Sequence, residues 1–222
     1  MRPEEGPMAE FTLYGIALSA YVAKVRIVLE MKRADHVELP PPDGYGSAAY
    51  RAIVPAGSVP GLVHGDVVLS DSNAIAEYLD ELIPDPPLMP ADPAGRARVR
   101  MVLGFHDTRL EASARTLYPV IRAGWRSRPE AVAAGLDGMV AALERLEAML
   151  ADVPRGPFLS DLALPVTLQT MTMIAARLER PLQLPPGIAG RVEAVAALPA
   201  VARSLALHRP ALAEWLDRFD PG

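Results

Sequence analysis

The chain of 222 residues contains no cysteine. This absence excludes disulfides, thiolate zinc sites, iron–sulfur clusters and a cysteine nucleophile. Histidine is scarce as well, and the four histidines show neither the HxH nor the HExxH spacing of common metal sites: His36, His64, His106 and His208. We therefore expect no metal ion in the protein.

Basic residues are in the minority, with 22 Lys and Arg against 27 Asp and Glu and a formal net charge of −5. No basic run is present that would neutralise a phosphate backbone. We expect no nucleic-acid partner. Half of the residues are hydrophobic, 50%, and 22% are charged, which is typical of a globular protein.

Long hydrophobic runs are also lacking. The longest uncharged run, Leu162 to Ala176, contains Thr and Gln and is shorter than the roughly 20 apolar residues of a membrane-spanning helix. Glu4 and Glu5 stand near the N-terminus with no apolar block after them, unlike a secretory signal. We expect no membrane span and a cytoplasmic location, with Met1 to Met8 disordered.

The first part of the chain, residues 9–84, has a mixed α/β pattern. Phe11 to Gly15 predicts a strand, and a helix with Val22, Val25, Val28 and Leu29 on one face follows it. A weak strand signal lies near Val37 to Leu39, followed by an irregular segment. Two short strands then flank His64-Gly65-Asp66, and a helix ends before Pro84, with apolar residues at helical spacing: Ile75, Leu79, Leu82 and Ile83.

A proline-rich stretch over residues 85–92 reads as a linker, because proline cannot continue a helix. Beyond it, residues 93–222 show helical patterns and no convincing strand alternation. The sequence therefore predicts a second, all-α domain. Its expected helices span approximately Pro93 to Gly124, Pro129 to Leu150, Pro165 to Leu178, Gly187 to Leu198 and Pro210 to Phe219.

Three short features of the first domain are candidates for chemistry. Val59-Pro60 follows a glycine turn and precedes a strand, and a cis bond there would present the backbone N–H and C=O of Val59 to an extended peptide ligand. An ordinary trans turn proline is the commoner situation, since only about 5–6% of X–Pro bonds are cis.

Asp71-Ser72-Asn73 begins the helix that ends near Pro84. Backbone N–H groups and the Ser72 hydroxyl can receive a carboxylate at this position, and Asp71 can pair with an amino group, so the turn can hold the head of an α-amino acid. Plain N-capping explains the same residue types.

Ser19 lies where the first strand gives way to the first helix. Its hydroxyl can donate to a bound thiolate, which lowers a thiol pKa from about 8.5 towards neutrality. Helix capping is again the alternative explanation.

Together these features resemble the cytosolic glutathione S-transferase family. The resemblance lies in FTLYGIALSAYVAKVRIVLE (residues 11–30), in PAGSVPGLVHGDVVLSDSNAIAEYLDELIPDPPLMPADP (residues 55–93) and, more loosely, in the helical remainder to Trp215. It implies a thioredoxin-like N-terminal domain and an all-α C-terminal domain. It also implies a cis Val59-Pro60 bond and glutathione held by Val59, Pro60, Ser58, Asp71 and Ser72.

The resemblance further implies that Ser19 supports the glutathione thiolate, as in serine-type classes such as tau and theta, in zeta-like members or in bacterial ones. Tyr14 is the alternative, because other classes use a tyrosine at the end of the first strand. Two departures stand out. No Ser-Ser-Cys-Ser run precedes the first helix, which weakens zeta-type isomerisation, and Ser58 replaces the Lys or Gln usual before Val-Pro.

The expected activity is conjugation of the glutathione thiolate to a hydrophobic electrophile in detoxification, by a homodimer. Two alternatives remain: a glutathione-dependent isomerase, dehalogenase or etherase with a narrow substrate, and a non-catalytic protein that binds glutathione or a hydrophobic ligand. Four residues of the second domain fall near one helical face and are candidates for the substrate cleft: Phe105, Arg109, Ser113 and Tyr118. A buried helix face explains that spacing equally well, and His106 and Asp107 are expected to be surface or interdomain groups.

Overall fold

The computed structural model describes residues 10–219, and these divide into two compact units. The division of the chain falls between Pro86 and Pro87, inside the proline-rich segment that separates the two sequence patterns. Residues Met1 to Met8, for which the sequence predicts disorder, lie outside the described range, as do residue 9 and residues 220–222.

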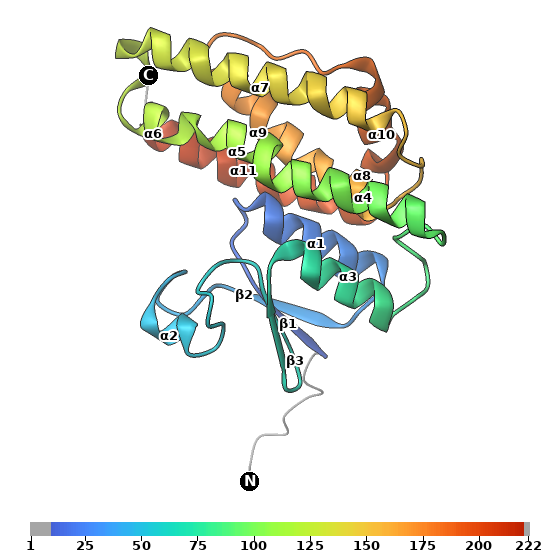
Figure 1. Ribbon diagram of the computed structural model, residues 1–222. Coiled ribbons are helices and arrows are strands. Elements are labelled where there is room, and N and C mark those ends of the chain that lie inside the picture. Colours follow the sequence, from blue (N-terminus) through green and yellow to red (C-terminus); the bar gives the residue numbers. More distant parts are fainter. Residues whose placement is uncertain (1–9, 220–222) are drawn as a thin grey trace. The chain divides into compact units, whose positions relative to one another are not determined.

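The first unit is built on a mixed four-stranded sheet (Figure 1). Its strands are β1 (Phe11–Tyr14), β2 (His36–Leu39), β3 (Gly61–His64) and β4 (Val67–Ser70), in the order β2-β1-β3-β4. β1 runs parallel to β2 and antiparallel to β3, and β3 and β4 form a hairpin. The helices of this unit are α1 (Ala20–Met31), the short α2 (Ala48–Arg51) and α3 (Ser72–Leu82).

Helices α1 and α3 pack together on one side of the sheet (Figure 1). Their apolar faces follow the sequence pattern, since Val22, Val25 and Leu79 are all fully buried. A buried ion pair joins the two helices, with Lys32 Nζ 2.7 Å from the Asp80 carboxylate. The strand and helix order that the sequence predicts for this part is confirmed, including the weakly signalled strand β2.

The second unit contains helices only among the residues that the structure describes. Its first half comprises α4 (Pro93–Phe105), the π-helical turn η1 (His106–Leu110), α5 (Glu111–Arg115), α6 (Leu117–Arg122), the 3-10 turn η2 (Trp125–Ser127) and α7 (Pro129–Leu150). Its second half comprises α8 (Leu159–Leu162), α9 (Leu164–Arg177), α10 (Pro186–Ala196) and α11 (Pro199–Phe219). The thioredoxin-like plus all-α architecture is thus confirmed.

Two helix predictions for this unit are wrong in detail. The last helix begins at Pro199 rather than Pro210, and it carries Pro210 in its interior. An interior proline costs about 3 kcal/mol, but Val201, His208 and Leu212 place a buried stripe on both sides of it, and this packing outweighs the penalty. The predicted helix from Pro93 to Gly124 is interrupted by the π-helical turn at residues 106–110.

The stretch Leu159–Arg177, which includes α8 and α9, is long and apolar enough to cross a membrane by length and composition, with a mean hydropathy of 1.2. In the structure, 83% of the apolar window is buried inside the protein. This is the pattern of a central core helix, which passes the same test of length and composition.

Candidate functional site

The sheet of the first unit brings the three sequence features to one end. In the strand register, Tyr14 at the end of β1 pairs with Gly61 at the start of β3, and Gly61 pairs with Ser70 at the end of β4. Val59-Pro60 directly precedes Gly61, and Asp71-Ser72 directly follows Ser70. The loop from Tyr14 to Ser19 leaves the same edge and enters α1. Residues separated by about 50 positions in sequence therefore lie at the same end of the sheet, which we call the rim.

Ser19 is the N-cap of α1, and its side chain is 9% exposed. The Val22 backbone N–H donates to Ser19 Oγ over 3.3 Å. Because the hydroxyl oxygen acts as the acceptor in this bond, its hydrogen remains available for a donor bond to another group. A thiolate beside Ser19 would also lie at the positive end of a 12-residue helix. Capping and thiolate support are thus compatible at this position.

The Val59-Pro60 peptide bond is cis in the structure, as the resemblance implies. Tyr50, which is fully buried, fixes the residue before this pair, because its hydroxyl donates to the Ser58 carbonyl over 3.0 Å. Gly61 lets the ring approach, since a Cβ there would lie 2.5 Å from the Tyr50 hydroxyl. Ser58 itself is exposed and Val59 is half-buried. The Tyr50 hydroxyl thus anchors the chain directly before the cis bond, and Val59 is partly exposed.

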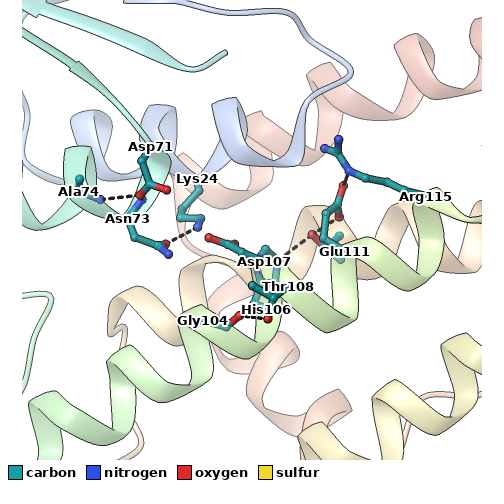
Figure 2. Close-up of polar contacts among 11 residues, drawn as sticks. Lys24, Asp71, Asn73, Ala74, Gly104, His106, Asp107, Thr108, Glu111 and Arg115 are labelled. Carbon is teal, nitrogen blue, oxygen red and sulfur yellow. Dashed lines mark hydrogen bonds and ion pairs between the residues drawn. The ribbon is translucent and has the colours of Figure 1, made fainter. Parts of the chain in front are cut away.

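Asp71 combines a cap with an unusual backbone conformation. Its carboxylate Oδ1 accepts from the backbone N–H groups of Asn73 and Ala74, over 2.9 and 3.0 Å (Figure 2). Its φ is +81°, which few residues other than glycine adopt and which costs on the order of 1–3 kcal/mol. Two N–H groups of α3 are used by this cap. Ser72, the next residue, is 4% exposed, and its contact with a ligand carboxylate stays a prediction.

Lys24 supports the same turn from α1. Its side chain is 1% exposed, its ammonium donates to Asn73 Oδ1 over 2.6 Å (Figure 2), and it lies 5.6 Å from the centre of the Tyr21 ring. The sequence gives no signal for this role, because the two partners lie 49 positions apart. The contact links the second turn of α1 to the first turn of α3.

Tyr14, the alternative to Ser19, is half-buried at the end of β1, and its ring lies 5.6 Å from the ring of Tyr50. Burial raises the pKa of Tyr50 to about 12, and the nearby Tyr14 adds to the shift. The two tyrosine rings pack against each other, and the Tyr50 hydroxyl donates the hydrogen bond to the Ser58 carbonyl. The catalytic assignments of Ser19 and Tyr14 stay predictions at this point.

The four candidates for a substrate cleft all lie in the second unit but in different surroundings. Arg109 is exposed, and its guanidinium donates to the Thr108 carbonyl, while Phe105 and Ser113 are half-buried. A π-helix has more residues per turn than an α-helix, so residues 106–110 change the phase of the helix. The α-helical spacing that placed the four candidates near one face therefore does not hold across this turn. Tyr118 packs against Trp215 with ring centres 5.0 Å apart.

Tyr118 is a half-buried titratable residue. Burial raises the pKa of its hydroxyl to about 12, the Glu111 charge adds to the shift, and Arg115 and Arg122 oppose it. A hydroxyl of this kind stays protonated at neutral pH. The role of these four side chains in a substrate cleft stays a prediction.

A buried polar network in the second unit was missed by sequence reasoning. His106, predicted to be a surface or interdomain group, is fully buried within the structure. Its Nδ1 lies 2.7 Å from the Asp107 carboxylate and its Nε2 lies 2.8 Å from Thr167 Oγ1. Thr167 donates its hydrogen to Glu111 over 3.0 Å, and Glu111 pairs with Arg115 (Figure 2).

The hydrogen-bond directions determine where the protons of this network lie. Because Thr167 gives its one hydrogen to Glu111, its oxygen accepts from Nε2–H of His106. On its other side, Nδ1 faces the Asp107 carboxylate. The His106 ring is thus held between an acidic side chain and a hydroxyl. Its partner Thr167 lies 61 positions away, beyond the reach of a sequence pattern.

A second buried ionic group joins Arg191 of α10 to Asp161 of α8 over 2.9 Å. The Arg191 guanidinium also donates to the carbonyls of Leu150, Val153 and Pro154, at and beyond the end of α7. Burial raises the pKa of the Asp161 carboxyl, although the bond to Arg191 acts to lower it. Residues 10–219 contain no group of three or more His, Asp or Glu side chains that is suited to a metal ion.

Comparison with known proteins identifies this architecture. Residues 13–87 match the family model for the N-terminal domain of glutathione S-transferase. Glutathione S-transferase Z2 of Arabidopsis thaliana is 40% identical over 92 residues, 40% of this chain and 41% of the relative. The matched part thus spans about two fifths of that curated relative.

Two solved structures match nearly the whole chain. The theta-class glutathione S-transferase of Xanthomonas axonopodis pv. citri, with glutathione bound, is 27% identical with a TM-score of 0.72, over 89% of this chain and 98% of that one. Maleylpyruvate isomerase, a bacterial zeta-class glutathione S-transferase in its holo form, is also 27% identical with a TM-score of 0.72, over 90% and 98%. The chain belongs to the cytosolic glutathione S-transferase family.

Proposed function

We propose that this protein is a glutathione transferase that binds glutathione in its first unit and joins the thiolate to a hydrophobic electrophile. The single observation that supports this most strongly is the common rim formed by the Ser19 cap, the cis Val59-Pro60 bond and the Asp71-Ser72 turn. Ser19 offers a hydrogen-bond donor to the thiolate, the Val59 backbone offers a strand-like edge to the peptide, and the Asp71-Ser72 turn offers a site for an amino-acid head group. Glutathione contains all three of these groups.

In the proposed complex, the Val59 backbone binds the cysteinyl part of glutathione as an added strand would. Ser72 receives the γ-glutamyl carboxylate and Asp71 receives its ammonium group. Ser58, exposed beside Val59, and Pro60 complete the wall of the site. Lys24 holds Asn73 and so keeps the turn of α3 in place. The rigid backbone reduces the entropy that is lost when the tripeptide is ordered.

The proposed reaction begins with loss of the glutathione thiol proton to water. The Ser19 hydroxyl donates to the sulfur and stabilises the anion, as a preorganised donor does for developing charge. The thiolate then attacks an electrophilic carbon, for example the carbon that bears chlorine in an aryl chloride. A C–S bond forms, the C–Cl bond breaks and chloride leaves with the bonding electrons. Phe105, Arg109, Ser113 and Tyr118 are the proposed residues of the substrate side.

The proposed setting follows the family. We expect a homodimer in the cytoplasm, acting on small hydrophobic electrophiles in detoxification, with no metal, nucleic acid or membrane required. The solved theta-class structure with glutathione bound supports the choice of glutathione as the co-substrate. Sedimentation of the purified protein tests the oligomeric state directly.

The test compares two serines that cap helices in the same unit. Ser19 caps α1 and Ser47 caps α2, each through a side-chain oxygen that accepts a backbone N–H. Loss of either cap costs about 1 kcal/mol of stability. We expect Ser19→Ala to lower kcat for an aryl chloride by at least about 100-fold, the scale of one removed anion donor. Ser47→Ala should leave kcat unchanged.

Glutathione binding by calorimetry and the ultraviolet absorbance of the bound thiolate complete this test. The wild-type complex should ionise well below the ordinary thiol pKa of about 8.5, and Ser19→Ala should raise that value while it retains affinity. Ser19→Thr, which keeps a hydroxyl, should retain part of the activity. Full activity of Ser19→Ala with loss in Tyr14→Phe would transfer the role to Tyr14.

The zeta-class structural match favours one alternative, a glutathione-dependent isomerase, with dehalogenation or ether cleavage as other uses of the same thiolate. In isomerisation the thiolate adds to one carbon of a cis double bond, the resulting single bond rotates and the thiolate leaves again, so that no atom is gained. Turnover of maleylpyruvate without consumption of glutathione would support the isomerase. A non-catalytic ligand carrier predicts glutathione affinity with no turnover in either assay.

A further inference from the structure

The proposed glutathione site leaves one charge of its ligand without a partner. Glutathione carries one ammonium group and two carboxylates at neutral pH. Asp71 is assigned to the ammonium group and Ser72 to the γ-glutamyl carboxylate, so the carboxylate of the C-terminal glycine remains. Ser58 offers no charge to it, because a serine stands where Lys or Gln is usual before Val-Pro.

The strand register determines on which side of Val59 the glycine would lie. Gly61 pairs with Ser70 in the antiparallel β3–β4 hairpin, so the turn that follows Ser70 continues on the side of Pro60. A γ-glutamyl group bound at that turn therefore lies on the Pro60 side of Val59. Because the peptide would run along this edge as an added strand does, at about 3.3 Å per residue, its glycine lies on the other side, next to Ser58.

Arg51 is the cation at this end of the site. It is the one Lys, Arg or His of residues 37–63, it occupies the last turn of α2, and it is exposed. Its side chain lies against Gly57, since a Cβ built at Gly57 would stand 3.0 Å from both Cγ and Nε of Arg51. Its guanidinium group thus lies beside the residue that precedes Ser58.

Two hydrogen bonds hold α2 beside this segment. The Tyr50 hydroxyl donates to the Ser58 carbonyl over 3.0 Å, and the Gly46 N–H, just before α2, donates to the Gly57 carbonyl over 2.8 Å. Within residues 10–219, the Arg51 guanidinium has no hydrogen-bond or ion-pair partner. Its five N–H donors are therefore available to an anion at the rim.

We propose, on the basis of the glutathione site described above, that Arg51 binds the C-terminal carboxylate of the thiol co-substrate and makes the site selective for thiols that carry a negative charge there. An arginine can hold a carboxylate through two parallel N–H donors. In this chain the cation has moved from position 58 to the last turn of α2, and the long arm of Arg51 replaces the short one of Ser58. The pair stays exposed, so salt should weaken it.

The experiment compares two ligands on two proteins. The ligands are glutathione and its ethyl ester at the glycine, which removes the C-terminal charge and keeps the γ-glutamyl and cysteinyl parts. The proteins are the wild type and Arg51→Gln, titrated by calorimetry at low ionic strength. We expect the wild type to bind glutathione at least about fivefold more tightly than the ester. Arg51→Gln should bind both ligands with the affinity that the wild type has for the ester.

Two further variants make the test specific. Arg33→Gln removes the same charge from an exposed arginine of the same unit, beyond the end of α1 opposite to Ser19, and should leave both affinities unchanged. Ser58→Lys in the Arg51→Gln background returns a cation to position 58 and should restore the preference for glutathione over the ester. A damaged fold would not be repaired in this way.

The four dissociation constants separate two kinds of failure. Equal losses of affinity for glutathione and for the ester in Arg51→Gln would overturn the proposal, because the effect would not depend on the carboxylate. A full preference for glutathione in Arg51→Gln, or no preference in the wild type, would also overturn it while the glutathione site itself stands. Binding of neither ligand to the wild type would instead contradict the proposed glutathione site, and the role of Arg51 with it.

Discussion

Both units bury an ion pair, Lys32–Asp80 in the first and Arg191–Asp161 in the second, but they differ in where their other polar groups lie. In the first unit, the polar groups of the proposed site lie at the ends of elements, where Ser19 and Asp71 cap helices. In the second unit, the polar networks around His106 and Arg191 lie inside the helical core, where these two residues are 0% and 5% exposed. End positions leave groups available to a ligand, whereas core positions require partners for every charge. We therefore expect substitutions at the helix caps of the first unit to change ligand binding, and substitutions in the buried networks of the second unit to change stability.

The largest effect is expected from the Arg191–Asp161 pair. Arg191→Met would leave the Asp161 carboxylate buried without its cation and would remove donors from three carbonyls. Breaking a buried pair in this way costs about 3–5 kcal/mol. Urea unfolding followed by the fluorescence of Trp125 and Trp215 measures it in the unit concerned.

The matched control for this change is Arg180→Met, which breaks an exposed pair with Asp137. An exposed pair contributes about 0–1 kcal/mol. The double variant Arg191→Met with Asp161→Leu should recover part of the lost stability, because no uncompensated charge remains. Equal losses from the two arginines would remove the distinction between core and surface charge on which the comparison rests.

The second-largest loss of stability is expected from substitution of the two buried histidines of the second unit, and the two losses should differ. His208, also fully buried, accepts at Nδ1 from Gln169, whose amide also donates to the Leu205 carbonyl, and donates from Nε2 to Thr170. The partners of His208 are neutral groups, whereas His106 lies 2.7 Å from the Asp107 carboxylate. His106→Asn should cost about 3–5 kcal/mol, and His208→Asn about 1–3 kcal/mol.

A double variant tests the coupling between His106 and Glu111 through Thr167. Replacing Glu111 by Gln in the His106→Asn background should cost less stability than the sum of the two single changes, because both residues bond to the same Thr167 hydroxyl. The same Glu111→Gln change alone should be destabilising. If His208→Asn proves as costly as His106→Asn, the contact with the Asp107 carboxylate adds nothing to the stability that His106 provides.

The third effect is a dependence on alkaline pH from Tyr118. Its pKa is raised from 10.0 to about 12, so between these values the unfolded chain loses a proton that the folded chain keeps. Stability therefore falls as the pH rises from 10 to 12, by up to about 2.7 kcal/mol at about 1.36 kcal/mol per unit. Tyr118→Phe should reduce this slope, and Tyr45→Phe, at an exposed tyrosine, should not. Unfolding in urea at pH 9, 10 and 11 measures both.

Local signals predicted the first unit better than the second. The strand and helix pattern, and the capping residues Ser19 and Asp71, follow from neighbours within a few positions, and a resemblance supplied the cis Val59-Pro60 bond. In the second unit, α7 has the predicted bounds, Pro129–Leu150, because its apolar stripe is long and regular. The partners of His106 and Arg191 lie 61 and 30 positions away, so tertiary packing rather than local pattern determines them.

Pro210 shows that local signals can also misplace the start of a helix. A proline is a strong local signal for the start of a helix, and it led to a predicted start at Pro210. The structure instead continues the helix from Pro199, because buried residues on both sides of Pro210 belong to one stripe. A local penalty of about 3 kcal/mol is smaller than the burial of several side chains at about 1.5–3 kcal/mol each.

The smallest effect on stability distinguishes two capping aspartates, one in each unit. Asp71 caps α3 and Asp92 caps α4, each through Oδ1. Asparagine caps a helix as well as aspartate does, and at Asp71 it also tolerates the positive φ. Asp71→Asn and Asp92→Asn should each change stability by less than about 1 kcal/mol, the value of a charge at a helix end. Only Asp71→Asn should weaken glutathione binding, by about tenfold, because it removes the charge that pairs with the ligand ammonium. Calorimetric titration of both variants at one ionic strength measures this difference. Equal affinity in the two would mean that Asp71 serves as a cap alone, and the first unit would then hold its polar groups for structure in the same way as the second.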